Sequence, residues 1–231
     1  MRSPDWHEFT SREKLAAALA SVVADVLRAA IEKRGNALLA VSGGNTPALF
    51  FSELSQQELG WDSVTVTLVD ERFVPEDSPR SNARLVRKNL LQGKAAAARF
   101  AGLFSNASTV EDAAESAGKR LSRLSLPLDA VILGMGTDGH TASFFPDAGN
   151  LESLLDLSAE AIIAPVRAAS GGEPRLTLTL ARILEAGFVA LHIEGAEKRR
   201  ALGAAVSGEA HLPVGAVLDR APQPVQVFWA P

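Results

Sequence analysis

The sequence predicts an α/β fold in which a mainly parallel β-sheet is covered by helices on both faces. Short apolar segments that favour strands alternate along the chain with longer segments of helical periodicity. The strand segments at 37–41 and 130–133 are apolar at every position, which is typical of parallel strands buried on both sides. No repeat or linker-like stretch interrupts the 231 residues, so we expect residues 1–231 to form one domain.

The first half of the chain is expected to contain four helices and two strands. Thr10-Ser11-Arg12-Glu13 has the form of a capping box that begins a helix, and Gly35 is suited to end it. The elements expected after it are a strand at 37–41, a turn at 42–47, a helix through Leu54, a strand at 64–69, a polar loop at 70–79, and helices at 82–91 and 109–124. In the second half we expect strands at 129–133, 161–166, 188–193 and 225–229, and a helix at 196–206.

Composition excludes several classes of protein. The chain has 23 Lys and Arg against 27 Asp and Glu, and a net charge of −4 does not favour binding to nucleic acid through a basic surface. It has no Cys, which excludes disulfides, thiol catalysis and Cys-ligated zinc, and its 4 His are scattered, so we expect no metal site. The polar N-terminus does not resemble a secretory signal, and no apolar run approaches the ~20 residues of a membrane-spanning helix. We therefore expect a cytoplasmic protein that does not bind membranes.

The first candidate site follows the first expected strand. Gly43 and Gly44 allow a ligand to approach the backbone closely, and the helix after Pro47 offers free N–H groups and the positive end of its dipole. Asn45 or Thr46 could cap that helix, and Thr46 could also donate to a phosphate oxygen. This arrangement is typical of a phosphate site, although an ordinary tight turn explains the same residues.

The second candidate site follows the second expected strand. Asp70-Glu71-Arg72 places two acids and a base at a strand end, with Ser81-Asn82 downstream. Such a cluster is rarely needed for packing, and surface ion pairing is the alternative explanation. In a parallel sheet the carboxyl ends of the strands form the usual binding crevice.

The third candidate site is the loop from Gly134 to Pro146. It contains G-x-G-x-x-G after a strand, but Pro146 leaves no room for the substantial helix that a dinucleotide fingerprint requires. Asp138 and His140 place a carboxylate and an imidazole in the loop, and a His among small residues at a strand end is a candidate general base. The alternative is a structural His bonded to backbone.

The remaining candidates are weaker when taken singly. We expect His192 to lie in the core and His7 and His211 to lie at the surface. For Arg175 and Lys198, each considered alone, the default expectation is a solvated side chain at the surface.

Taken together, the loops resemble the 6-phosphogluconolactonase family, within the wider glucosamine-6-phosphate isomerase/deaminase-like superfamily. The resemblance runs from about residue 9 to the C-terminus and has no clear departure in the three main motifs. The residues that carry it are Ser42-Gly43-Gly44-x-Thr46-Pro47, Asp70-Glu71-Arg72 with Val74-Pro75 and Ser81-Asn82, Gly134-x-Gly136-x-Asp138-Gly139-His140-x-Ala142-Ser143-x-Phe145-Pro146, Pro174-Arg175-x-Thr177, and Gly195-x-x-Lys198. Arg72 looks like the lactonase branch, because the deaminases usually have an aromatic residue there.

The resemblance implies a Rossmann-like three-layer α/β/α sandwich that hydrolyses 6-phosphoglucono-1,5-lactone in the oxidative pentose phosphate pathway, with no metal or organic cofactor. It implies that His140 activates water and that Asp138 orients the imidazole or binds a sugar hydroxyl. Arg72 is expected to stabilise the oxyanion or bind substrate, and Asp70 to bind sugar hydroxyls. The phosphate is expected on Gly43, Gly44, Asn45 and Thr46, with Arg175 and Lys198 supplying charge.

Two other functions remain open at this point. An amino-sugar-phosphate isomerase/deaminase would share the three loops, and Arg72 argues against it. A non-catalytic sugar-phosphate sensor would carry an additional DNA-binding segment, for which we expect no room before the first helix. The oligomeric state is expected to be a monomer or a weak dimer.

Overall fold

The structure is a computed structural model that describes residues 3–231. Its centre is a seven-stranded sheet in which every neighbouring pair of strands is parallel. The strands, in their order across the sheet, are β1 (Asp5–Glu8), β10 (Gln226–Ala230), β9 (Phe188–Glu194), β6 (Ala130–Leu133), β2 (Ala37–Val41), β3 (Val64–Leu68) and β5 (Arg99–Ala101).

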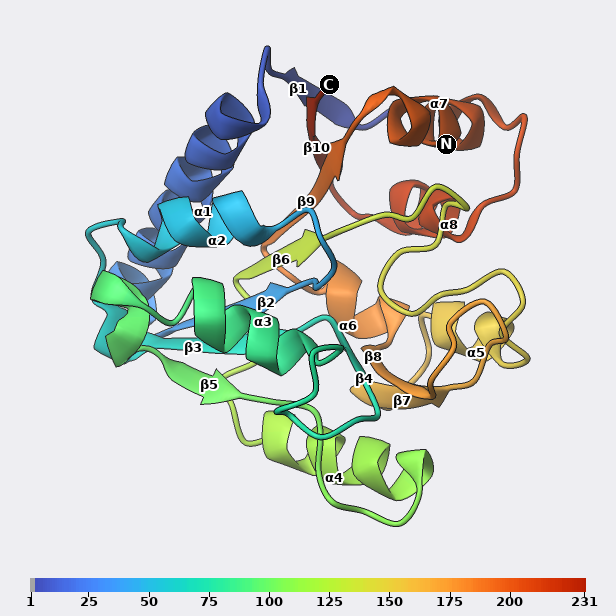
Figure 1. The fold of residues 1–231 in the computed structure, drawn as a ribbon, viewed down its shortest axis with the longest axis horizontal. Helices are drawn as coiled ribbons and strands as arrows, with labels where there is room; N and C mark the ends of the chain where they lie inside the picture. The colour runs from blue at the N-terminus through green and yellow to red at the C-terminus, as the bar shows by residue number, and fades with distance from the viewer. Residues whose placement is uncertain (1–2) are drawn as a thin grey trace.

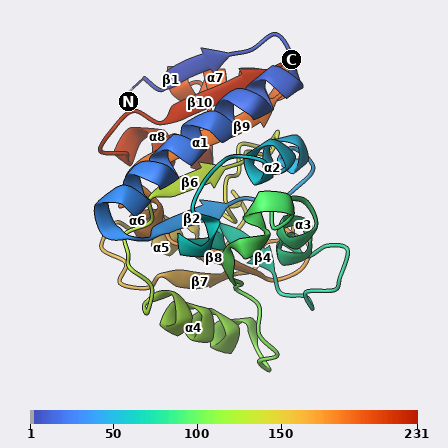
Figure 2. The same cartoon turned by 90° about the vertical axis from the view of Figure 1, so that its left-hand side faces the viewer.

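Helices cover both faces of this sheet (Figures 1 and 2). Helices α1 and α2 lie on one face, where α1 packs on β2, β6 and β10, and helices α6, α7 and α8 lie on the other. The helices are α1 (Arg12–Arg34), α2 (Ala48–Ser55), α3 (Asn82–Asn89), α4 (Val110–Leu121), α5 (Leu151–Leu155), α6 (Leu180–Leu184), α7 (Ala196–Ser207) and α8 (Pro213–Arg220), with short 3-10 turns η1 (Trp61–Ser63) and η2 (Gly93–Ala97). The predicted three-layer α/β/α fold is confirmed.

The core explains why these segments become these elements. All residues of β2 and β6 are buried, as their apolar runs require. Helix α1 buries a stripe that includes Leu15, Leu19 and Leu27 at helical spacing. Burying each such Leu contributes about 1.5–3 kcal/mol, so α1 is held chiefly by this stripe rather than by helix propensity.

A second, smaller sheet corrects two sequence predictions. Strands β4 (Asp70–Arg72), β8 (Arg175–Leu178) and β7 (Ile163–Val166) pair antiparallel, and α4 packs against β7 and β8. The polar loop expected at 70–79 therefore begins as a strand, and the segment expected at 161–166 does not join the parallel sheet. Both errors have one cause, because β4 and β7 each pair antiparallel with β8, a strand that the sequence analysis did not predict.

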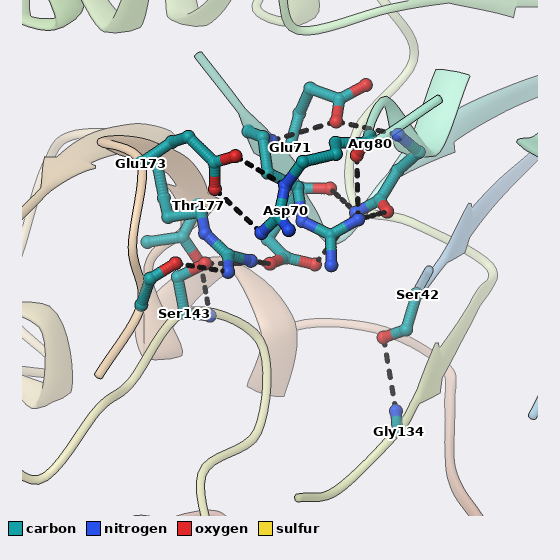
Figure 3. A network of polar contacts seen from close by, with 12 residues as sticks. Ser42, Asp70, Glu71, Arg80, Gly134, Ser143, Glu173 and Thr177 are labelled. Carbon is teal, nitrogen blue, oxygen red and sulfur yellow. Dashed lines mark hydrogen bonds and ion pairs between the residues drawn. The ribbon is translucent and has the colours of Figure 1, made fainter. Parts of the chain in front are cut away.

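The order of strands places a topological switch point between β2 and β6. From β2 the chain proceeds through β3 and β5 to one edge, whereas β6, β9 and β10 lie on the other side. The loops after β2 and β6 therefore diverge around a crevice at the carboxyl ends of the strands, which is where ligands bind in open α/β sheets. The Gly134 N–H donates to Ser42 Oγ at 3.1 Å and fastens the two loops together where they separate (Figure 3).

The other expected elements are confirmed with small shifts at their ends. Ser11, not Thr10, caps α1, because its Oγ accepts from the Lys14 N–H, and Gly35 ends the helix with φ 77°. No helix among the described residues combines the length and the apolar character needed to cross a membrane.

Candidate active site

The loops at the switch point enclose a pocket of about 260 Å³. Its walls come from the loop after β2, the loop after β6, β4, the start of α3, β8 and the start of α7. This volume is near the lower end of small-molecule sites, about 300–1,000 Å³. Nine of the ten predicted site residues line it, and they are Gly43, Gly44, Asn45, Thr46, Asp70, Arg72, His140, Arg175 and Lys198.

The tenth, Asp138, acts on His140 instead of lining the pocket. Asp138 Oδ1 lies 2.6 Å from His140 Nδ1 and also accepts from the His140 backbone N–H at 3.2 Å. A carboxylate on Nδ1 favours the tautomer with the proton on Nδ1, which leaves the Nε2 lone pair available. The His140 side chain is 31% exposed and packs on the Phe145 ring, with 4.6 Å between ring centroids.

Gly136 is required by this pair. A Cβ at Gly136 would lie 2.4 Å from Asp138 Oδ1 and 2.4 Å from His140 Nδ1. The bare backbone therefore lets the carboxylate and the imidazole meet above it. No helix begins directly after Gly139, and the next one, α5, starts only at Leu151, which agrees with rejecting the dinucleotide fingerprint.

Arg72 is held by the residues after it. Its Nη1 donates to Asn82 Oδ1 at 2.8 Å and to the Arg80 carbonyl at 2.8 Å. Asn82 is buried, and its side chain lies against Gly43, where a Cβ would come within 1.9 Å of Asn82 Oδ1. Asn82 thus joins the loop after β2 to the guanidinium of Arg72.

Asp70 lies at the centre of a polar network drawn in Figure 3. Its Oδ2 accepts from Ser143 Oγ at 2.7 Å and lies 3.5 Å from Arg175 Nη1. Its Oδ1 has a 3.5 Å contact with Asn82 Nδ2. Asp70 therefore links β4 to the His140 loop, to β8 and to α3.

Arg175 is buried opposite Arg72 in the register of β4 and β8. Burial lowers the pKa of its guanidinium, and the nearby Asp70 carboxylate opposes that shift. Arg175 Nη2 donates to the Gly171 carbonyl at 2.7 Å, and the guanidinium lies 5.2 Å from the centre of the Phe145 ring. The sequence-based default of a solvated surface residue is wrong for Arg175.

A third guanidinium, that of Arg80, stands beside this network. Arg80 Nη2 donates to Glu173 Oε2 at 2.8 Å and so bridges the loop before α3 to the loop before β8 (Figure 3). The pKa of the Glu173 carboxyl is lowered, chiefly by a hydrogen bond from its own backbone N–H. The charges of Arg80 and Arg175 lower it further.

Lys198 lines the pocket from the start of α7. Its Nζ lies 3.4 Å from Thr46 Oγ1, and burial lowers its pKa while Glu194 opposes the shift. Neither Asn45 nor Thr46 caps α2, so that expectation was wrong. Pro47 is the N-cap and forms no side-chain cap hydrogen bond, which leaves the first amides of α2 without a side-chain acceptor.

Sequence reasoning missed four residues that touch the site: Ser143, Phe145, Asn82 and His192. The first three stood inside recognised motifs, but only the fold shows what they contact. His192 is buried as expected, yet it also lines the pocket. His7 and His211 are exposed, as predicted. Within residues 3–231, no three His, Asp or Glu side chains are grouped as a metal site.

Comparison with known proteins agrees with this geometry. The family model for glucosamine-6-phosphate isomerases/6-phosphogluconolactonase matches residues 10–229. The chain is 61% identical to a 6-phosphogluconolactonase of Mesorhizobium japonicum over 99% of this chain and 96% of that protein. It is 52% identical to one of Rhizobium meliloti, over 99% of this chain and 100% of that protein. A crystal structure of a 6-phosphogluconolactonase from Shewanella baltica superposes with a TM-score of 0.95 at 38% identity, covering 99% of this chain and 98% of the other. With a family match across nearly its whole length, the chain belongs to the glucosamine-6-phosphate isomerase/6-phosphogluconolactonase family.

Proposed function

We propose that this enzyme hydrolyses 6-phosphoglucono-1,5-lactone to 6-phosphogluconate, a step of the oxidative pentose phosphate pathway. The observation that carries the proposal is the His140–Asp138 pair, with 2.6 Å between Nδ1 and Oδ1, beside a pocket that also holds Lys198 and Arg175. A general base beside cationic side chains in one small pocket suits a substrate with a neutral lactone ring and an anionic phosphate group. The names of the relatives support the same substrate.

In the proposed mechanism His140 Nε2 takes a proton from water as the water oxygen bonds to the lactone carbonyl carbon. Asp138 holds the imidazole through Nδ1 and stabilises the imidazolium that forms. The bond from the carbonyl carbon to the ring oxygen then breaks, and the imidazolium gives its proton to that oxygen. Positioned general-base assistance contributes about 10²–10⁴ in rate.

Arg72 is proposed to stabilise the oxyanion that develops on the carbonyl oxygen. Its Nη1 is already fixed by Asn82 and the Arg80 carbonyl, so little reorganisation is needed when the charge appears. A positioned donor of this kind contributes about 10²–10³ in kcat. Asp70 is proposed to accept from a sugar hydroxyl through Oδ1, since its Oδ2 is already bonded to Ser143.

The phosphate is proposed to lie at the amides of Gly43, Gly44, Asn45 and Thr46, with Lys198 and Arg175 as its counter-charges. Lys198 already reaches the Thr46 hydroxyl, and the amino end of α2 follows that loop. Helix amino ends favour anions, and the planar fork of Arg suits phosphate oxygens.

A deaminase reaction is the competing activity within the family. It would use Asp70 as a proton-abstracting base, but Asp70 Oδ2 is held by Ser143 and lies near Arg175. A carboxylate held in this way is better suited to positioning than to moving a proton. Ammonia release from glucosamine 6-phosphate is the assay that would reveal this activity.

The deciding experiment measures consumption of freshly generated lactone, corrected for spontaneous hydrolysis, with EDTA present. We expect rapid hydrolysis by wild type and a loss of about 10²-fold or more in kcat for His140→Ala. A folded wild-type protein that does not accelerate hydrolysis would refute the proposal. Near-normal turnover by His140→Ala would remove His140 as the base.

Several further interpretations remain proposals. One domain over residues 1–231 predicts a single cooperative unfolding transition, and sedimentation should give a monomer or a weak dimer. A cytoplasmic location is proposed because the substrate is a phosphorylated metabolite, and cell fractionation tests it. We propose no nucleic-acid partner, and no metal or cofactor takes part in the proposed steps.

A further inference from the structure

Glu71 is a fully buried carboxylate that the proposed mechanism does not use. It stands between Asp70 and Arg72 in β4, with none of its surface exposed. Its Oε1 accepts from the backbone N–H groups of Arg72 at 2.8 Å and Asn82 at 2.7 Å. Its Oε2 accepts from Ser81 Oγ at 2.9 Å and from the Ala83 N–H at 2.8 Å. Figure 3 shows Glu71 above Asp70 in the same network.

The two carboxylate oxygens serve different groups. Oε2 satisfies the start of α3, where Ser81 is the N-cap and also accepts from the Arg84 N–H. Oε1 instead joins the backbone of Arg72 to the backbone of Asn82. These are the two residues whose side chains meet through the 2.8 Å bond between Arg72 Nη1 and Asn82 Oδ1.

The result is a closed loop of contacts around the guanidinium. Asn82 Nδ2 also donates to the Asp70 carbonyl at 2.8 Å, so the amide is fixed at both of its ends. Because Asn82 is buried against Gly43, it has little room to choose another rotamer. The direction of Arg72 therefore depends on where Oε1 of Glu71 holds the Asn82 backbone.

A buried carboxylate at position 71 costs folding free energy, so stability by itself does not explain its presence. Burial raises the pKa of the Glu71 carboxyl, and the hydrogen bonds from Asn82, Ala83, Arg72 and Ser81 oppose that shift. Among residues 3–231, no Lys, Arg or His forms an ion pair with it. Helix α3 already has Ser81 as its N-cap. Helix α4 has Thr109 as its N-cap and forms without a buried acid at that end, so α3 does not need Glu71 for capping alone. Local departures from the most stable choice are expected at functional sites.

We propose that Glu71 is a positioning residue for the proposed lactonase reaction: its Oε1 holds the backbones of Arg72 and Asn82 so that the Asn82 amide aims the Arg72 guanidinium into the pocket. This inference depends on the proposed function only for its kinetic readout. Glu71 itself does not touch substrate.

The test compares Glu71→Ala and Glu71→Gln with Thr109→Ala, a matched control that removes a helix cap from α4 away from the site. For Glu71→Ala we expect kcat to fall about 10²-fold, the cost of a misplaced transition-state donor, with KM changed less than about threefold. Glu71→Gln can keep one oxygen on the Arg72 and Asn82 N–H groups and should retain kcat to within about tenfold. Thr109→Ala should lower thermal stability but leave kcat unchanged.

A double-mutant cycle separates positioning from general stability. If Glu71 acts through Arg72, adding Glu71→Gln or Glu71→Ala to Arg72→Ala should cost less than about threefold more in kcat. Fully additive losses, or wild-type kcat in folded Glu71→Ala, would overturn the inference. If Glu71→Ala does not fold, the cycle with Glu71→Gln decides.

An NMR measurement keeps the inference separate from the activity. The Arg72 Nε–H resonance, assigned with Arg72→Lys, should shift or broaden in Glu71→Ala, shift less in Glu71→Gln, and stay unchanged in Thr109→Ala. Without lactone hydrolysis by wild type the proposed function fails, yet this resonance still reports whether Glu71 holds the guanidinium. An unchanged resonance in folded Glu71→Ala would overturn the positioning role.

Discussion

Replacing Gly136 by Ala should separate catalysis from folding. The added methyl group would lie 2.4 Å from Asp138 Oδ1 and 2.4 Å from His140 Cε1 and Nδ1. Gly136 does not have a left-handed backbone, so Ala is not strained by its φ angle. The clash therefore falls on the two side chains that form the His140–Asp138 pair.

The size of the effect follows from the geometry. To restore a separation of about 3.0–3.4 Å, each group must move by about 0.6–1.0 Å, which can lengthen the 2.6 Å contact between Nδ1 and Oδ1 to about 3.2–3.6 Å, at or beyond the limit of a good hydrogen bond. A misplacement of about 1 Å costs about 10²-fold in rate, and loss of the whole base costs up to about 10⁴-fold. Because the side chains of His140 and Asp138 are 31% and 44% exposed, they can swing toward solvent without unfolding the protein.

We therefore expect kcat of Gly136→Ala to fall about 10²–10⁴-fold, with KM within a few-fold of wild type and native circular dichroism. The assay is the background-corrected lactone assay across a substrate series. Gly203→Ala is the control, because a Cβ at Gly203 meets nothing within 4 Å and Ala favours the helix. Wild-type kcat in Gly136→Ala, or a further large loss when it is added to His140→Ala, would refute the reasoning.

Three other variants test the rest of the pocket. Gly43→Ala puts a Cβ 1.9 Å from Asn82 Oδ1, so it should displace Asn82 from Arg72 and lower kcat at least about tenfold; unchanged steady-state kinetics would contradict this. Because burial lowers the pKa of Lys198, its positive charge should be lost at a lower pH than for a free lysine. Calorimetry should therefore show that 6-phosphogluconate binds more weakly as pH rises toward 10. In Lys198→Arg the affinity should change less over the same pH range. Arg175→Ala should raise KM for the phosphorylated lactone more than for gluconolactone, and an unchanged ratio of the two would remove Arg175 from the phosphate site.

The parts of the fold that the sequence predicts well are those that local pattern determines. Strand β2 was predicted with its observed ends, and β6 to within one residue, because five and four consecutive apolar residues must be buried on both faces. Glycine-rich loops after these strands then lie at the carboxyl edge in any parallel arrangement. This is why the five predicted site residues in these two loops line one pocket although the strand order was not predicted; they are Gly43, Gly44, Asn45, Thr46 and His140.

The parts that the sequence does not predict depend on distant partners. Strand β1 is Asp-Trp-His-Glu, which has no apolar run and is a strand only because it pairs with β10 at the other end of the chain. No strand was predicted at β8, where Leu and Thr alternate after Arg175. The burial of Arg175 follows from its pairing opposite Arg72, which no local property of either segment encodes.

That same pairing has a consequence for binding. Two arginines directly opposite each other in an antiparallel pair repel, and the burial of Arg175 removes water that would screen this repulsion. In keeping with this, Arg72 adds to the effect of burial in lowering the pKa of Arg175, while Asp70 opposes it. The nearby carboxylates of Asp70 and Glu173 offset part of this positive charge, and an anionic ligand would offset more. The second sheet therefore provides positive charge at the switch point that the parallel sheet alone does not supply, and it holds that charge in place before substrate arrives.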